Sequence, residues 1–406
     1  MKVDKVKVGV VGLGMVCYSH IDAYEAHPNA EVVAVCDLNE AQAKAVAEKY
    51  GIPKYYTDYE EMLKDTEINT IDIATPTFTH SRMTIQAAEA GKNISCEKPF
   101  CLTLEDGMAA CEAAKKNGVT LMVGESYVFM TSIMKARELI DAGEIGKPTQ
   151  IRERFGAWIE KGGVMDNRPV SANREWRMDS SKAGGNGFPW MFDHCVHFFS
   201  TAEYLMNDSK IKEVYSLKSS LDWMNDQQKH KVENDKMHLY GTNAAGDIPI
   251  MTWTYEDSAC QGVWMRAEYL NGKYDPYTGF SVIVSGDKGM IEVLGEGGKG
   301  LKHEGKDAHL VLYRQDGTSE MFRFDEGGDE IWDSEVSYYS RAHRNQIFEF
   351  VDNLVEGKET RYSGVDGTRA VRTTMAAICS AKEDVPVKVD EVDDARYNKK
   401  EKYRCV

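Results

Sequence analysis

The sequence lacks any long apolar segment. Its 406 residues contain only apolar runs of a few residues, whereas a membrane-spanning helix needs about 20. The first residues, Met1 to Lys5, are mostly polar and lead directly into a strand-like run. They have neither the apolar stretch nor the small-residue cleavage site of a signal peptide. We therefore expect a cytoplasmic protein that has no membrane partner.

Paired cysteines and an excess of positive charge are also missing. The nine cysteines are scattered and none forms a C-x-x-C pair, which argues against a disulfide framework or a zinc ribbon and fits a reducing compartment. Asp and Glu (65) outnumber Lys and Arg (49), so the formal net charge is -16. An acidic surface repels phosphate backbones, and no nucleic-acid partner is expected.

Residues 1–126 alternate between strand and helix patterns. Short apolar, β-branched runs separated by helical stretches predict an α/β domain with a doubly wound parallel sheet, the Rossmann arrangement. Asn39 and Thr103 are suitable helix N-caps, and Gly51, Gly91 and Gly118 are suitable helix ends. The expected strands are 6–11, 31–36, 70–74, 93–96 and 119–123, and the expected helices are 40–50, 58–64, 80–91 and 103–117.

Residues 127–390 follow a different pattern, with long alternating runs and hairpin-type turns such as Asp287-Lys288-Gly289. They predict an α+β domain on a large, mostly antiparallel open sheet, with helices at 341–356 and 364–382. An open sheet with an apolar face would aggregate if left uncovered, so we expect a homo-oligomer formed through this sheet. Residues 391–406 are expected to form a charged surface tail.

The turn after the first strand carries a nucleotide-binding pattern. Gly12 and Gly14 allow a tight turn and a close approach of the backbone to a pyrophosphate at a helix N-terminus. The third glycine of the fingerprint is replaced by Cys17. Asp37 ends the second strand, where a carboxylate binds ribose hydroxyls and repels a 2′-phosphate, which favours NAD over NADP. The alternative for Asp37 is an exposed aspartate at a strand end.

Lys98 lies in the tripeptide Glu97-Lys98-Pro99 at the carboxyl end of a predicted parallel strand. In open α/β sheets this edge faces the ligand crevice. A lysine there can hydrogen-bond a substrate oxygen and stabilise negative charge that develops on it. The alternative is a surface lysine in a loop.

A second candidate site lies in the apolar segment 188–199, which predicts a largely buried helix that begins near Pro189. Asp193 and His197 are spaced i, i+4 and share one face. A histidine with a nearby carboxylate is suited to act as a general base, although such a pair can also satisfy itself in a core. His194 is either a substrate contact or a packed histidine. These histidines are too few to hold a metal, and no metal site is expected.

Together these motifs resemble the glucose–fructose oxidoreductase / inositol dehydrogenase (Gfo/Idh/MocA) family of NAD(P)-dependent sugar and polyol oxidoreductases. The resemblance covers nearly the whole chain. The motifs that carry it are Gly12-x-Gly14-x-x-Cys17-x-x-His20, Ala74-Thr75-Pro76-Thr77-x-x-His80, Glu97-Lys98-Pro99, Trp176-Arg177 with Gly184-Gly185, and Asp193-x-x-x-His197.

The resemblance implies hydride transfer between a sugar hydroxyl and the nicotinamide, with Lys98, His197 and Asp193 as the catalytic residues. The implied cofactor-binding residues are Gly12, Gly14, Met15, Val16, Asp37, Thr75, Pro76, His80, Glu97, Lys98, Trp176 and Arg177. The candidate substrate-binding residues are Tyr127, Trp158, Arg174, Asn186 and His194.

Three departures from the family bear on the substrate, one of which is the unusually bulky segment Asn186-Gly187-Phe188-Pro189-Trp190. The segment after the fifth strand reads Glu125-Ser126-Tyr127, where the family often has Asn and Arg. The stretch 158–176 is longer than usual and rich in Arg, Asn and aromatic residues. These features resemble members that oxidise the C3 hydroxyl of glycosides, including C-glycosides. Relatives that cleave glycosides through transient C3 oxidation, without net redox change, and relatives that only sense sugars or dinucleotides are the alternatives.

Overall fold

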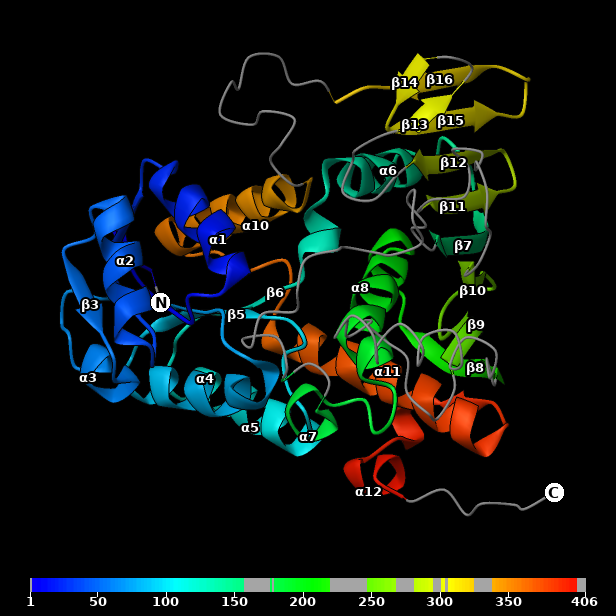
Figure 1. The fold of residues 1–406 in the computed structure, drawn as a ribbon. Coiled ribbons are helices and arrows are strands. Elements are labelled where there is room, and N and C mark those ends of the chain that lie inside the picture. The colour runs from blue at the N-terminus through cyan, green and yellow to red at the C-terminus, as the bar shows by residue number, and fades with distance from the viewer. Residues whose placement is uncertain are drawn as a thin grey trace, which may run out of the picture. The chain divides into compact units, whose positions relative to one another are not determined.

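The computed structural model places the chain in two units (Figure 1). The first consists of 1–129, 181–184 and 339–371, and the second of 130–180, 185–338 and 372–406. The predicted first domain ends at residue 126 and lacks residues 339–371, which belong to the first unit in the structure. The sequence could not show this, because the apolar face of a helix does not specify which sheet it covers. The structure describes residues 2–156, 176, 179–219, 247–267, 281–294, 301–303, 306–324 and 338–399.

The first unit contains a six-stranded sheet in the order β3-β2-β1-β4-β5-β6, and all its strands pair in parallel. This confirms the predicted doubly wound sheet. The short strand β3 follows α2 and is not among the predicted strands. The strands are β1 (Val6–Val11), β2 (Ala30–Cys36), β3 (Lys54–Tyr56), β4 (Thr70–Ile73), β5 (Asn93–Glu97) and β6 (Leu121–Gly124).

Capping side chains and glycines set where the helices of this unit begin and end. Asn39 and Thr103 accept hydrogen bonds from the backbone N–H groups of Gln42 and Asp106, as N-caps do. Gly51 ends α2 with φ +68°, a left-handed conformation that suits glycine. The helices are α1 (Met15–Glu25), α2 (Glu40–Tyr50), α3 (Tyr59–Leu63), α4 (His80–Glu89) and α5 (Leu104–Lys116).

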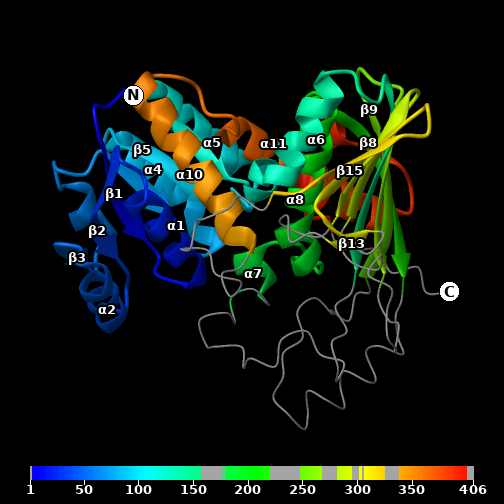
Figure 2. The ribbon, with the colours of Figure 1, turned by 90° about the horizontal axis from the view of Figure 1, so that it is seen from above.

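Helix α10 (Tyr338–Glu356) completes the first unit from far along the chain, and it lies beside α1 in both views (Figures 1 and 2). Its apolar residues share one core with β1 and α1. The residues of this core that α10 contributes are Ile347, Phe350, Val351 and Leu354. Without them, apolar surface of β1 and α1 would face water.

The second unit contains a nine-stranded sheet in the order β16-β15-β12-β11-β7-β10-β9-β8-β17. Among the strands described, β7 and β10 pair in parallel and the other recorded neighbours pair antiparallel, which confirms the predicted sheet. Its strands are β7 (Pro148–Gly156), β8 (Ile211–Ser219), β9 (Asp247–Tyr255), β10 (Gln261–Ala267), β11 (Ser281–Gly286), β12 (Gly289–Leu294), β15 (Leu310–Arg314), β16 (Ser319–Phe322) and β17 (Val387–Lys388); β13 (Leu301–His303) and β14 (Lys306–Ala308) pair separately.

Helix α8 (Pro189–Leu205) packs on this sheet through aromatic side chains. The Phe198 and Trp264 rings lie 5.3 Å apart, and the Phe199 and Trp253 rings 5.6 Å apart. The other long helices are α6 (Thr131–Asp141) and α11 (Gly364–Glu383). No helix in the described part of the chain has a stretch long and apolar enough to cross a bilayer.

The segment after β17 is more ordered than the predicted surface tail. It forms a short helix, α12 (Asp394–Tyr397). Tyr397 is only 4% exposed, and its ring lies 6.3 Å from that of Phe192. The first part of the tail therefore packs into the second unit, because two apolar residues, Val392 and Tyr397, are spaced to face inward.

Candidate functional site

The predicted nucleotide and catalytic residues of the first unit gather at one edge of its sheet. Because its strands are parallel, the turns that follow β1, β2, β4, β5 and β6 all emerge at the same edge. These turns carry the glycine pair, Asp37, Thr75 with Pro76, Lys98 and Glu125, respectively.

The two glycines of the turn after β1 have different structural requirements. Gly12 has φ +88°, and a Cβ built there would lie 2.7 Å from the carbonyl carbon and oxygen of Ala74. Gly14 is exposed at the N-terminus of α1, and a Cβ there would meet nothing within 4 Å. The fold thus requires Gly12, whereas Gly14 leaves the helix N-terminus open to a phosphate.

The third fingerprint position belongs to the core. Cys17 has no exposed surface, and its thiol donates to the carbonyl oxygen of Gly14 at 3.0 Å. Burial, with a smaller contribution from nearby carboxylates, raises the pKa of this thiol to about 12. Met15 is 63% exposed and Val16 half-buried in the first turn of the same helix, so a nucleotide can reach both.

Asp37 is held rigidly beside the glycine turn. Its Oδ2 accepts from the backbone N–H of Leu13 at 2.9 Å, and its Oδ1 accepts from that of Asn39 at 2.8 Å. Each carboxylate oxygen has a further lone pair, so the group can still accept hydrogen bonds from the two ribose hydroxyls. The acceptors present therefore fit the adenosine ribose of NAD, and the predicted contact of Asp37 with the cofactor stays a prediction.

His80 connects two loops of this edge. Its Nδ1 lies 2.8 Å from the carbonyl oxygen of Pro99, and its Nε2 lies 2.7 Å from that of Thr75. The imidazole is 1% exposed. Because each ring nitrogen contacts the backbone carbonyl of a different loop, His80 fixes the loop of Thr75 relative to the loop of Lys98. Its predicted contact with the cofactor stays a prediction.

Lys98 has a buried carboxyl group, that of Glu125, as its neighbour at the end of the adjacent strand. Glu97 pairs in register with Gly124, so Lys98 and Glu125 follow directly at the ends of adjacent strands. Lys98 is half-buried and Glu125 is 1% exposed. Burial raises the pKa of Glu125 to about 8, although Lys98 and a hydrogen bond from the Tyr127 N–H lower it.

Glu125 is the residue of this edge that the sequence analysis did not place in the site. The available signal was its position, since a carboxyl that follows a parallel strand beside the Lys98 strand must lie at the same edge. Tyr127, in the short 3-10 helix Ser126–Phe129, has no exposed surface. Its predicted contact with the substrate stays a prediction.

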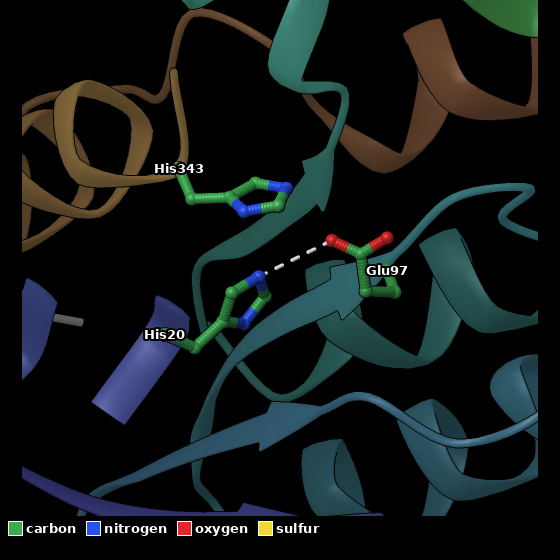
Figure 3. A group of neighbouring side chains, drawn as sticks. All are labelled: His20, Glu97 and His343. Carbon is green, nitrogen blue, oxygen red and sulfur yellow. Dashed lines mark ion pairs between the residues drawn. The ribbon is translucent and has the colours of Figure 1, made fainter. Parts of the chain in front are cut away.

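The side chain of Glu97, the residue before Lys98, lies in a buried cluster with His20 and His343 (Figure 3). The His20 Nε2 lies 3.4 Å from the Glu97 Oε1. Burial alone would lower the pKa of His20, but Asp72 and Glu97 raise it to about 10. Burial alone would raise the pKa of Glu97, but the hydrogen bond and charge of His20 lower it to about 2. The predicted contact of Glu97 with the cofactor stays a prediction.

In the second unit, Asp193 and His197 are buried on α8, with 7% and 5% of their surface exposed. The ion pair recorded for Asp193 joins its Oδ2 to the Nδ1 of His194 at 3.5 Å. The predicted pairing of Asp193 with His197 stays a prediction. Asn186 donates to the carbonyl oxygen of Tyr397 at 2.6 Å, and Trp176 is half-buried. Trp158, Arg174 and Arg177 lie outside the described residues.

Comparison with known proteins identifies both halves of the chain. Residues 6–125 match a model described as "Oxidoreductase family, NAD-binding Rossmann fold", and residues 137–389 match "Oxidoreductase family, C-terminal alpha/beta domain". A myo-inositol 2-dehydrogenase of Thermotoga maritima is 26% identical over 386 residues, which cover 95% of this chain and 99% of that protein.

Other relatives have related names. A scyllo-inositol 2-dehydrogenase (NAD(+)) of Bacillus subtilis is 29% identical over 388 residues, 95% of this chain and 97% of that protein. A levoglucosan dehydrogenase of Pseudarthrobacter phenanthrenivorans is 30% identical over 213 residues, which cover 50% of this chain and 52% of that protein.

Solved structures agree with these matches. A probable dehydrogenase from Thermotoga maritima superimposes with a TM-score of 0.69 at 26% identity, covering 95% of this chain and all of that one. A levoglucosan dehydrogenase in complex with NADH and levoglucosan has a TM-score of 0.73 at 21% identity and the same coverage, which shows a shared fold. The chain belongs to the Gfo/Idh/MocA family of oxidoreductases, with its NAD-binding Rossmann domain followed by its C-terminal α/β domain.

Proposed function

We propose that this protein is an NAD-dependent dehydrogenase that oxidises a ring secondary hydroxyl of a sugar or cyclic polyol. Within this class we propose the C3 hydroxyl of a glycoside or C-glycoside as the reacting group. The observation that supports an enzyme is the strand-end edge of the first unit. There a glycine turn and a fixed Asp37 adjoin a half-buried Lys98 that has a buried carboxyl as its neighbour.

The nucleotide would bind along this edge. The backbone of Gly12, Gly14, Met15 and Val16 would bind the pyrophosphate at the N-terminus of α1. Asp37 would accept hydrogen bonds from the adenosine ribose and repel a 2′-phosphate, and the loop of Thr75 and Pro76 would lie against the cofactor. When bound, NAD supplies the acceptor for the hydride.

The remaining steps belong to this chain's own side chains. Lys98 would hydrogen-bond the reacting hydroxyl oxygen and stabilise its negative charge, and His197 would take the hydroxyl proton with Asp193 orienting the ring. The support is the place of Lys98 at the strand ends, the burial of Asp193 and His197 on one helix, and the family motif that contains them. Other residues proposed to bind the substrate or cofactor are Trp158, Arg174, Trp176, Arg177, Asn186 and His194.

A product assay tests this function. The protein is purified without added cofactor, incubated with NAD, and offered inositols, levoglucosan, free sugars, O-glycosides and C-glycosides. NADH absorbance and product mass are followed together. We expect a product whose mass is lower than that of the substrate by two hydrogen atoms, with one NADH formed for each product molecule. Release of an aglycone without net NADH would replace this proposal by redox-neutral glycoside cleavage. Bound NAD without any product would support a sensor instead.

The variant Lys98→Met tests the catalytic assignment. Because the lysine stabilises charge on the reacting oxygen, its loss should lower kcat at least ~100-fold while NAD affinity, measured by calorimetry, stays as in the wild type. Lys116→Met, at the exposed end of α5, is the matched control and should turn over normally. Normal turnover by Lys98→Met would refute the assignment.

A further inference from the structure

We propose that His20, Glu97 and His343 bind a divalent transition-metal ion, with Zn²⁺ the best-suited occupant. The three side chains converge from α1, the end of β5 and α10 (Figure 3). One ligand atom from each lies within 4.8 Å of the others, and all three residues are buried. Two imidazoles and one carboxylate are a donor set that proteins use for Zn²⁺.

The contact between His20 and Glu97 already has the spacing of two metal ligands. The His20 Nε2 and Glu97 Oε1 lie 3.4 Å apart, which is longer than a good charge-assisted hydrogen bond of about 2.7–2.9 Å. Two ligands at about 2.0–2.1 Å from a tetrahedral Zn²⁺ are separated by roughly 3.3 Å. The observed distance therefore matches one edge of a zinc tetrahedron.

The orientation of His20 is fixed by a second carboxylate. Its Nδ1 lies 3.0 Å from one oxygen of Asp72 and 3.2 Å from the other, and Tyr24 donates to the same carboxylate at 2.9 Å. With Nδ1 donating to Asp72, the lone pair of Nε2 faces Glu97. A metal-binding histidine usually donates its other ring N–H to a carboxylate in this way. Because two lone pairs repel each other, either a proton or a metal ion must lie between Nε2 and the Glu97 carboxylate, and the proposal assigns the metal ion.

A second observation points to the same place. Gln346 follows His343 by one turn on α10 and has no exposed surface. Neither its amide nitrogen nor its amide oxygen has a hydrogen-bond partner within the described ranges. A Cβ built on Gly124 would lie 2.7 Å from the Glu97 Oε1 and 3.3 Å from the Gln346 Nε2. The unpaired amide and the Glu97 carboxylate thus both approach Gly124, which places a buried polar group without a recorded partner beside the cluster.

The ion would act as a structural link beneath the Lys98 loop. Its ligands join α1 and β5 to the returning helix α10, and Glu97 directly precedes Lys98. The sequence did not indicate this site because its ligands are separated by 77 and 246 residues, without the short spacing of a zinc motif. The binding does not depend on the proposed dehydrogenase activity.

Metal binding is measured directly on the full-length, tag-free chain. The protein is dialysed against a chelator, and the apo form is titrated with Zn²⁺ and, separately, with Co²⁺, whose visible absorption reports tetrahedral coordination. We expect one ion per chain. His343→Gln and Glu97→Gln should weaken binding at least ~100-fold, beyond what loss of a merely orienting neighbour costs. Two variants are used so that one that fails to fold, judged by circular dichroism, leaves the other informative.

His27→Gln is the matched control. His27 is a buried histidine of the same unit, paired with Asp352 at 3.2 Å and set against Phe348, outside the cluster. It should bind the ion as tightly as the wild type. Wild-type protein that binds no ion, or binds it no better than His343→Gln, would overturn the proposal and leave a proton between His20 and Glu97. Neither result depends on turnover of any sugar.

Discussion

Replacing Glu125 by glutamine should change how the stability of the first unit depends on pH. Glu125 is 1% exposed, and burial raises its pKa to about 8 against the opposing effects of Lys98 and the Tyr127 N–H. The folded protein therefore keeps this carboxyl protonated at neutral pH. The unfolded chain releases the proton near the ordinary pKa of 4.5. Glu125→Gln keeps the size of the side chain and removes this difference.

The sign and size follow from the two pKa values. Because the folded pKa is the higher one, the stability that Glu125 contributes is fully present below pH 4.5 and is lost as the pH rises toward about 8. Each pH unit in that window costs about 1.4 kcal/mol. Between about pH 5 and 7 the wild type should lose roughly 2.5 kcal/mol through this group. The glutamine variant should not lose it.

Urea unfolding at several pH values in this window measures the difference. All seven tryptophans lie outside the segments of the first unit, so tryptophan fluorescence reports the second unit alone. Far-ultraviolet circular dichroism reports both units, and the part of its transition that fluorescence does not share is assigned to the first unit. Glu89→Gln, on the exposed end of α4, is the control and should follow the wild type. The reasoning is refuted if Glu125→Gln loses stability with pH as steeply as the wild type does.

Four further substitutions have expected outcomes. Gly12→Ala should lower the free energy of unfolding by more than ~1 kcal/mol because of its positive φ and the close Ala74 backbone, whereas Gly14→Ala should unfold like the wild type and only weaken NAD binding in calorimetry; equal stability of both variants would contradict this. Asp37→Ser should lower the preference for NAD over NADP about 10-fold, a loss of ~1.4 kcal/mol, and unchanged dissociation constants for the two nucleotides would count against its ribose role. Glu153 on β7 is 1% exposed, burial raises its pKa well above the usual range, and neither of its oxygens has a partner in the part of the chain that is described. Glu153→Leu should therefore raise the unfolding free energy at neutral pH by ~1–3 kcal/mol. A melting temperature below that of the wild type would contradict this expectation.

The strand-end edge could be predicted because its signals are local. Apolar β-branched runs that end at Gly12, Asp37 and Lys98 specify both the strands and their directions. Parallel pairing then requires that the residues after the strands share one edge. The N-caps Asn39 and Thr103 were equally readable, since each acts on a backbone N–H a few residues away.

The cluster around Glu97 could not be predicted because its partners are distant in sequence. The pattern of α10 shows an apolar face, but periodicity does not say which sheet that face covers or that His343 and Gln346 lie beneath β5. The burial of Glu125 could not be predicted for a related reason. A glutamate after a glycine is ordinarily an exposed loop residue, and only the three-dimensional packing around the end of β6 buries it.

The return of α10 to the first unit has a consequence for biosynthesis. A ribosome makes β1 to β6 first, then more than two hundred residues of the second unit, and only then the helix whose Ile347, Phe350 and Val351 close the core around β1 and α1. Domains ordinarily fold in order as they are synthesised. Here the nucleotide-binding unit keeps an open apolar flank through most of translation and closes it only when its last helix arrives.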